Sequence, residues 1–218
     1  AAALCVSAAF ATAQTTGWAQ LSGEVVIPAG ETWYADESDM EKVNALTSIT
    51  LSGAETGEAA TLVFRDTSTA PKADLLKGAG VVRKSGMSVW SDYANAQTGF
   101  TGDWHLDGGV VTNTASGAFG NIDLDDGVGK LYVHDGAALV VNSRETEFFY
   151  RDLHINGSGN LLVPRALSMP KIMDCGVRRL HLDGDAAIET GPELADVLLN
   201  FIHHVDSKGL GINLDPAN

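Results

Sequence analysis

Basic residues are scarce in this sequence. Its 218 residues include 14 Lys and Arg against 28 Asp and Glu, which gives a formal net charge of −14 and a pI near 4.6. An acidic surface repels the phosphate backbone of nucleic acids and anionic lipid headgroups, so we expect neither as a partner. Carboxylate-rich loops can bind calcium weakly, whereas diffuse acidity is more typical of a solvated surface.

Long apolar runs and the motifs of common enzyme classes are also absent. No stretch beyond the N-terminal segment is apolar for long enough to cross a membrane as a helix. The sequence has no Gly-x-Ser-x-Gly elbow, phosphate-binding loop, zincin motif or cysteine pair, and no motif of the polygalacturonases or pectate lyases. GSGNL and GAGVV lack the Asp of calcium-binding nonapeptide repeats. The sequence therefore favours a protein that is not an enzyme.

Cysteine is nearly absent as well, with Cys5 and Cys175 alone in the chain. Leu4 precedes Cys5, at a place where a lipoprotein signal requires a small residue, which argues against lipid attachment. Cys5 also falls in a segment with the character of a signal peptide, so Cys175 is the one cysteine of the exported domain. An internal disulfide is excluded, and stability must come from packing and backbone hydrogen bonds.

That N-terminal segment, AAALCVSAAFATAQ, is apolar, rich in small residues and carries Ala-Thr-Ala before Gln14. The pattern is typical of the apolar region and cleavage site of a secretory signal peptide, without its basic start. We expect residues 1–13 to be the remainder of a signal peptide. Residues 14–218 then form the exported domain, truncated at the C-terminus inside the strand-like GLGINLDP. A buried strand is the alternative for residues 1–13.

Six short strings end on glycine at similar intervals along the chain. They are ITLSG, DLLKG, WHLDG, YVHDG, LHING and LHLDG, which end at Gly53, Gly78, Gly108, Gly136, Gly157 and Gly184. The intervals run from 21 to 30 residues, which is the range of one coil of a solenoid. A second apolar strand follows nearly every glycine, at Val81–Val82, Val110–Val111, Leu139–Val141, Leu161–Val163 and Ile188.

Two strands joined by a tight polar turn and repeated in this way predict an all-β chain folded as a right-handed parallel β-helix. Asp or Asn followed by Gly suits the turn, because Asp and Asn bond the following backbone and Gly adopts positive φ without strain. The same turn also joins antiparallel hairpins. An antiparallel β-sandwich or jelly roll is therefore the alternative, although it gives no reason for the regular interval.

Two segments fall outside the repeat. Residues 35–45, with four acidic side chains, indicate a polar excursion or a short helical turn. Apolar residues spaced by three and four between Leu194 and Val205, with Pro192 before them and Gly209 after them, predict a short C-terminal amphipathic helix over the coil stack.

The segment Leu75–Val111, LLKGAGVVRKSGMSVWSDYANAQTGFTGDWHLDGGVV, resembles the autotransporter-associated β-strand repeat of bacterial autotransporter passengers. In that pattern paired glycines precede an apolar pair, a Lys and a Gly, then an Asn, an aromatic-Thr-Gly turn and a strand closing on Gly. The matching positions are Gly78, Gly80, Val81, Val82, Lys84, Gly86, Asn95, Phe100, Thr101, Gly102, Gly108 and Gly109. Ser88 stands where the family usually has Gly, and Asp92–Gln97 departs from the usual approach to the turn. The resemblance implies a β-helical exported passenger or surface scaffold.

Histidine recurs between two large apolar residues at His105, His154 and His181. If the apolar neighbours face the core, strand alternation places the histidines on the outer face, in a column that advances about 4.8 Å per coil. Parallel side chains do not converge on an ion, so we interpret the column as a solvent-facing ladder, with a metal site at His154 and His181 as the alternative. In the intervening coil Val133 holds the aligned place and His134 lies one step out of phase.

Asp123, Asp125 and Asp126 in NIDLDDG are the best candidates for carboxylate catalysis. β-Helix enzymes that cleave acidic polysaccharides place paired Asp residues on one outer face, with calcium or as an acid and base pair. Arg144, Arg151 or Lys130 would supply a basic side chain near this cluster. Turns select Asp and Gly in any case, so a turn is the simpler interpretation.

Two further groups of residues have a structural interpretation before a functional one. His203 and His204 lie close to Asp206, but adjacent residues on a helix point about 100° apart, which favours a surface position over a metal site. Trp18, Trp33, Trp90 and Trp104 would stack on sugar rings if exposed in a row, whereas packing in the core is the commoner fate of Trp in strands.

We therefore expect an exported, adhesin-like β-helical scaffold, secreted or held at the outer membrane of a bacterium, with no required cofactor. Its expected partners are surface glycans or other cell-surface molecules. The alternatives are a polysaccharide lyase or hydrolase on the same fold, with Asp123, Asp125 and Asp126 at its site, and a non-catalytic glycan-binding module.

Overall fold

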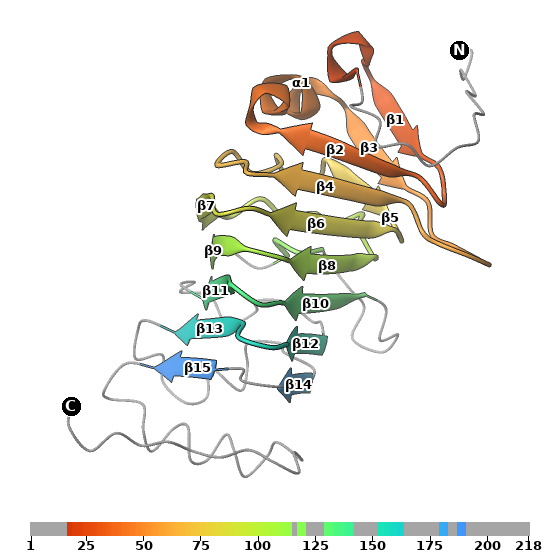
Figure 1. Ribbon diagram of the computed structural model, residues 1–218. Coiled ribbons are helices and arrows are strands. Elements are labelled where there is room, and N and C mark those ends of the chain that lie inside the picture. Colours follow the sequence, from red (N-terminus) through yellow and green to blue (C-terminus); the bar gives the residue numbers. More distant parts are fainter. Residues whose placement is uncertain are drawn as a thin grey trace, which may run out of the picture.

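The computed structural model describes residues 17–114, 117–120, 129–141, 152–163, 179–182 and 187–190. Every strand pairing within these residues is parallel and joins one coil to the next. The coils stack as a β-solenoid (Figure 1). The structure confirms the predicted all-β parallel β-helix, is consistent with right-handed winding, and contradicts the antiparallel sandwich or jelly roll.

The strands form three sheets around the core. The first sheet contains β1 (Glu24–Ile27), β3 (Ser48–Leu51) and β5 (Leu76–Gly78). The second contains β2 (Thr32–Asp36), β4 (Thr61–Arg65), β6 (Val81–Ser85), β8 (Asp103–Leu106), β10 (Lys130–Val133), β12 (Asp152–Ile155) and β14 (Arg179–Leu182). The third contains β7 (Val89–Tyr93), β9 (Gly109–Asn113), β11 (Ala137–Val141), β13 (Asn160–Val163) and β15 (Ala187–Thr190). The second sheet runs along the whole stack (Figure 1).

Two short 3-10 helices and one α-helix occur in the described part of the chain. They are η1 (Trp18–Gln20), η2 (Glu37–Asp39) and α1 (Met40–Ala45). A capping box between Asp36 and Asp39 begins the helical turn, and Met40 and Val43 bury its apolar side. The helical turn predicted for residues 35–45 is confirmed. The predicted amphipathic helix between Leu194 and Val205 lies outside the described residues.

The core follows from strand alternation in the second sheet. One inward row contains Leu62, Val82, Trp104, Leu131 and Leu153, which are all fully buried. The other inward row contains Phe64, Lys84, Leu106, Val133 and Ile155, also fully buried. Side chains of successive residues point to opposite faces, so the residues between these rows face outward.

The predicted alignment of the glycines is partly wrong, because it combines strands of two different sheets. Gly53 and Gly78 follow or end strands of the first sheet, whereas Gly108, Gly136 and Gly157 follow strands of the second. A short strand that ends near glycine thus occurs at two different corners of a coil. Along the second sheet the paired positions advance by between 20 residues, from Val63 to Arg83, and 29 residues, from Tyr34 to Val63.

Glycines allow successive coils to approach closely at their corners. Gly80 and Gly102 come just before β6 and β8, in consecutive coils, and a Cβ at Gly102 would overlap the carbonyl oxygen of Gly80. Gly78 has a φ of 86°, and a Cβ there would overlap the Leu51 carbonyl. The glycines of the segment with the repeat-like pattern therefore have a steric reason, which holds whatever the family of the chain.

Candidate functional site

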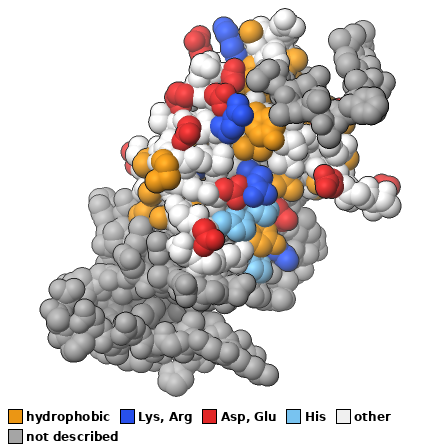
Figure 2. All heavy atoms as spheres, in the orientation of Figure 1, with side chains coloured by type: hydrophobic (Ala, Val, Ile, Leu, Met, Phe, Trp, Pro, Cys, Tyr) orange, Lys and Arg blue, Asp and Glu red, His pale blue; other side chains and the backbone are white. Residues whose placement is uncertain are grey.

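Two outward rows of side chains cross the second sheet. The first outer row contains Tyr34, Val63, Arg83, His105, Tyr132 and His154, which are backbone partners in successive coils. The second outer row lies at the carboxyl ends of the strands and contains Asp36, Arg65, Ser85, Asp107, His134 and Asn156. Figure 2 shows histidine side chains beside acidic and basic ones on one face of the molecule. The candidate site contains residues of both rows, on β8 and in the turns that follow β8 and β10.

Rings in the first outer row stack on one another along the solenoid. The centroids of His105 and Tyr132 are 4.5 Å apart with 18° between the ring planes, and those of Tyr132 and His154 are 4.8 Å apart with 28°. These distances match the spacing of neighbouring strands, so the sheet itself sets the stack. The faces of the rings are turned toward one another, which leaves ring edges to meet a ligand from solvent.

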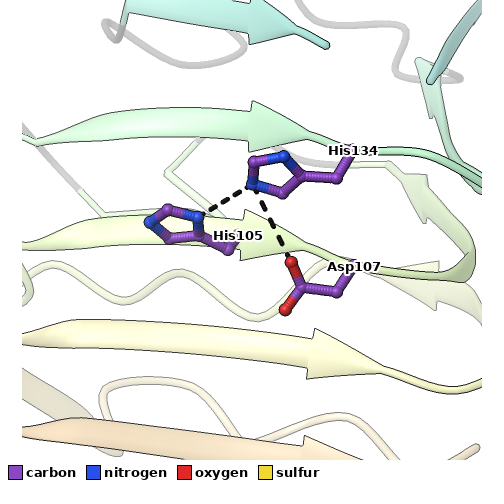
Figure 3. A group of neighbouring side chains, drawn as sticks. All are labelled: His105, Asp107 and His134. Carbon is purple, nitrogen blue, oxygen red and sulfur yellow. Dashed lines mark hydrogen bonds and ion pairs between the residues drawn. The ribbon is translucent and has the colours of Figure 1, made fainter. Parts of the chain in front are cut away.

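His105, Asp107 and His134 form a group that we name the imidazole–carboxylate cluster (Figure 3). His105 Nδ1 lies 2.9 Å from His134 Nε2, and His134 Nε2 lies 3.8 Å from Asp107 Oδ1. One potential ligand atom from each of the three residues lies within 4.8 Å of the others, and all three side chains are half-buried. Among the described residues, this is the one group of three or more His, Cys, Asp or Glu side chains with that geometry.

Two neighbours hold the cluster in place. Arg83 donates from Nε to Asp107 Oδ2 at 2.7 Å and from a terminal nitrogen to Oδ1 at 2.8 Å, so the guanidinium fixes the carboxylate plane. Asn156 Nδ2 lies 3.4 Å from His134 Nδ1, on the side of the ring away from His105. Asp107 and His134 are therefore each held by a residue of an adjacent strand or turn.

The surroundings keep His105 uncharged. Burial lowers the pKa of His105 to about 4, and the guanidinium charge of Arg83 and the neighbouring His134 act in the same direction. Asp107 and Asp103 act in the opposite direction. The imidazole is therefore neutral at neutral pH, and one of its nitrogens carries a lone pair that can bind a proton donor or a metal ion.

The structure corrects the sequence alignment at this point. Tyr132, and not Val133, pairs with His105, and Val133 pairs with Leu106 and is fully buried. Three residues separate Tyr132 from Gly136, whereas two separate His105 from Gly108. Counting back from the two glycines therefore pairs His105 with Val133 instead of Tyr132. His134 therefore lies in the second outer row. Its ring contacts His105, which lies in the first outer row of the preceding coil.

The other predicted site residues are placed as follows. His154 lies in the first outer row, and His181 is its backbone partner on β14. Lys130 begins β10, and its backbone N–H donates to Asp103 Oδ1 at 2.7 Å. The remaining candidates lie outside the described residues: Asp123, Asp125, Asp126, Arg144, Arg151, His203, His204 and Asp206.

The tryptophans do not form an exposed row. Trp18, Trp90 and Trp104 are at most 2% exposed, and Trp33 is half-buried against the core. Trp90 and Trp104 pack edge to face at 6.5 Å, within a group of aromatic rings that also contains Phe64, Tyr93, Phe100 and Phe119. Their role is core packing.

Comparison with protein families, curated proteins and solved structures finds no match to this chain. In the part of the chain that the structure describes, no helix is both long and apolar enough to cross a membrane.

Proposed function

We propose that this chain is a structural, adhesin-like β-helical scaffold of an exported bacterial protein. The proposal draws on the signal-like residues 1–13 and on the resemblance of Leu75–Val111 to the autotransporter-associated repeat. The solenoid fold also supports the proposal, because its length grows by added coils that contact only their neighbours. Such a fold extends outward without needing disulfides.

One observation carries the proposal most: the inward rows stay nearly uniform while the outward rows change from coil to coil. In the first outer row the side chains are successively aromatic, aliphatic, cationic and imidazole, from Tyr34 through Val63 and Arg83 to His105. The inward neighbours of these residues remain apolar apart from Lys84. A surface that varies without disturbing the core is suited to display, and its expected partners are surface glycans or other cell-surface molecules.

The proposal is tested by locating the protein on intact cells. Antibodies against the purified chain should label unbroken cells that make the protein, and external protease should remove the signal. A cytoplasmic protein measured in the same cells serves as the control for leakage. Labelling that requires cell lysis contradicts the proposal.

A second assay separates the scaffold from an enzyme. The purified chain is incubated with acidic and neutral polysaccharides, with and without calcium, and new reducing ends and unsaturated sugars are measured. We expect none. Product formation that disappears in an Asp125→Asn variant would instead establish the polysaccharide-degrading alternative and overturn the structural role.

A further inference from the structure

We propose that His105, Asp107 and His134 form a binding site for a first-row transition-metal ion, and that Zn²⁺ suits this ligand set. The proposal rests on the geometry of the imidazole–carboxylate cluster and is independent of the surface role proposed above. Two imidazole nitrogens and one carboxylate oxygen are donors that zinc uses in proteins, with the fourth position left to water. The three side chains are half-buried on the outer face of the sheet, so an ion reaches them from solvent.

The distances suit shared coordination. Zinc binds nitrogen and oxygen at about 2.0–2.2 Å, so two ligand atoms about 90–110° apart around the ion are about 2.9–3.4 Å from each other. The His105 Nδ1 to His134 Nε2 distance of 2.9 Å lies in this range. The His134 Nε2 to Asp107 Oδ1 distance of 3.8 Å is slightly longer. The ligand atoms of His105 and Asp107 lie within 4.8 Å of each other, and the planes of the two imidazoles are only 12° apart. Binding of an ion therefore requires both rings to rotate toward it and Asp107 to move closer.

The fold brings these residues together without a loop rearrangement. His105 and Asp107 lie two positions apart on β8 and its turn, so both side chains face outward. His134 follows β10, whose strand pairs directly with β8, and its backbone N–H donates to the Leu106 carbonyl at 2.9 Å. Each ligand is therefore anchored by the backbone ladder, which limits the entropy lost when an ion binds.

The charges favour a transition metal over calcium or magnesium. Arg83 forms a bidentate ion pair with Asp107 and neutralises the one carboxylate of the cluster. Calcium and magnesium depend on several charged or carbonyl oxygens, which the cluster does not supply. Imidazole nitrogens suit zinc, copper and nickel, and here they must provide most of the affinity.

Protons balance when the ion binds. In the metal-free cluster one imidazole N–H donates to the other ring across the 2.9 Å contact. In the tautomer in which Asn156 Nδ2 donates to His134 Nδ1, the shared proton is on His134 Nε2. The ion takes the place of that proton, which moves to Nδ1 of the same ring. Asn156 lies 3.4 Å from Nδ1, and rotation of its amide lets the side-chain carbonyl accept the N–H. Both imidazoles remain neutral and bind through their lone pairs.

Isothermal titration of the untagged chain with ZnCl₂ tests the site. The six histidines of the chain include the adjacent pair His203 and His204, so the titration uses a His203→Gln/His204→Gln background that removes this other candidate. We expect saturable binding of one ion per chain. His105→Gln and His134→Gln should each weaken binding at least about tenfold, and Asp107→Asn should weaken it less.

His154→Gln is the matched control, because His154 lies in the same outer row but outside the cluster. It should leave the affinity for Zn²⁺ within about twofold of the background protein. X-ray absorption of the zinc-loaded protein should show imidazole nitrogens at about 2.0–2.1 Å. These spectra also keep the test decisive if a histidine variant folds poorly.

Three results would overturn the proposal. One is the lack of saturable zinc binding in the background protein. Another is loss of binding in His154→Gln together with full binding in His105→Gln. The third is a calcium titration that responds to Asp107→Asn while zinc does not, which would make the cluster a site for oxygen-seeking cations instead.

Discussion

At the scale of single residues, Lys84 is the clearest departure from an apolar core. Its side chain is fully buried in an inward row between Phe64 and Leu106. Nζ donates to the carbonyl oxygens of Ser88 at 2.7 Å and Gly108 at 3.2 Å. Burial lowers the pKa of the Lys84 ammonium, and the carboxylate of Asp66 opposes this effect. Lys84 thereby satisfies backbone groups at the corner where two coils turn between sheets.

We expect Lys84→Met to lower the free energy of unfolding by about 1–3 kcal/mol, because the carbonyls of Ser88 and Gly108 lose a charged donor. Met retains most of the packing, so the change isolates the hydrogen bonds. Urea denaturation measures the effect. Arg65→Met is the control, since the ion pair of Arg65 with Asp36 is exposed and should contribute under about 1 kcal/mol. Equal stability of Lys84→Met and the wild type would refute this role.

Gly102 tests the close approach of neighbouring coils. An alanine Cβ at this position would overlap the backbone of Gly80, which has no side chain to move aside. We expect Gly102→Ala to cost about 3 kcal/mol or more, or to prevent folding. Gly30→Ala is the comparison: Gly30 has a φ of 81° but no neighbouring atom near its Cβ position, so it should cost about 1–2 kcal/mol. Similar thermal unfolding of the two variants would contradict the packing described here.

Residue identity alone predicts the outward position of His105 and the burial of Trp104, because strand alternation determines both. It does not predict that His134 meets His105. The two lie 29 residues apart, and one additional residue before Gly136 decides which outer row His134 occupies. The burial of Lys84 could not be predicted from the sequence either, because nothing in an alternating strand indicates that a charged residue faces inward.

At the scale of secondary-structure elements, acidic side chains connect the turns of successive coils. Glu37 accepts hydrogen bonds from Thr69, and Asp74 accepts them from the backbone N–H and hydroxyl of Thr98. Bonds from the Thr69 and Thr98 hydroxyls are the main reason that the pKa values of Glu37 and Asp74 lie below their usual 4.5 and 3.8. These carboxylates therefore stabilise the fold in their ionised form.

The sign of the resulting pH dependence follows from linkage. The pKa of each carboxyl is lower in the folded chain than in the unfolded chain, so its contribution is present above the unfolded pKa and is lost as the pH falls through the folded pKa. We expect Glu37→Gln and Asp74→Asn each to lower Tm at pH 7 by about 1–3 °C, since both groups are exposed. The difference from the wild type should shrink as the pH falls below the unfolded values of 4.5 and 3.8 and then through the lower folded values. A difference that stays constant with pH would show that ionisation is not the cause.

Strand existence was the most predictable feature at this scale. The second strands at Val110–Val111, Leu139–Val141 and Leu161–Val163 all fall within β9, β11 and β13. Assignment of strands to sheets was less predictable, because ITLSG and DLLKG have the same apolar-then-glycine pattern as the strings of the second sheet but belong to the first. Local pattern reports burial and turns, whereas the sheet to which a strand belongs depends on how many corners precede it in the coil.

At the scale of the whole molecule, the defining property is an uninterrupted parallel stack. The second sheet runs from β2 through β14 in a single order, and every step adds one coil (Figure 1). The outer rows, the ring stack and the imidazole–carboxylate cluster all depend on this register. A chain of the same composition folded as hairpins would separate His105 from His134 and Arg83 from Asp107.

The stack is tested most directly by the distance between nitroxide labels at Thr32→Cys and Arg179→Cys, with Cys5 and Cys175 replaced by Ser. Thr32 lies at the start of β2 and Arg179 at the start of β14, six steps along the second sheet. At about 4.8 Å per strand, pulsed electron paramagnetic resonance should give a single population centred at about 29 Å, broadened by the label linkers. A main population below about 20 Å, as when the chain folds back on itself, would contradict the parallel solenoid and with it the site on its outer face.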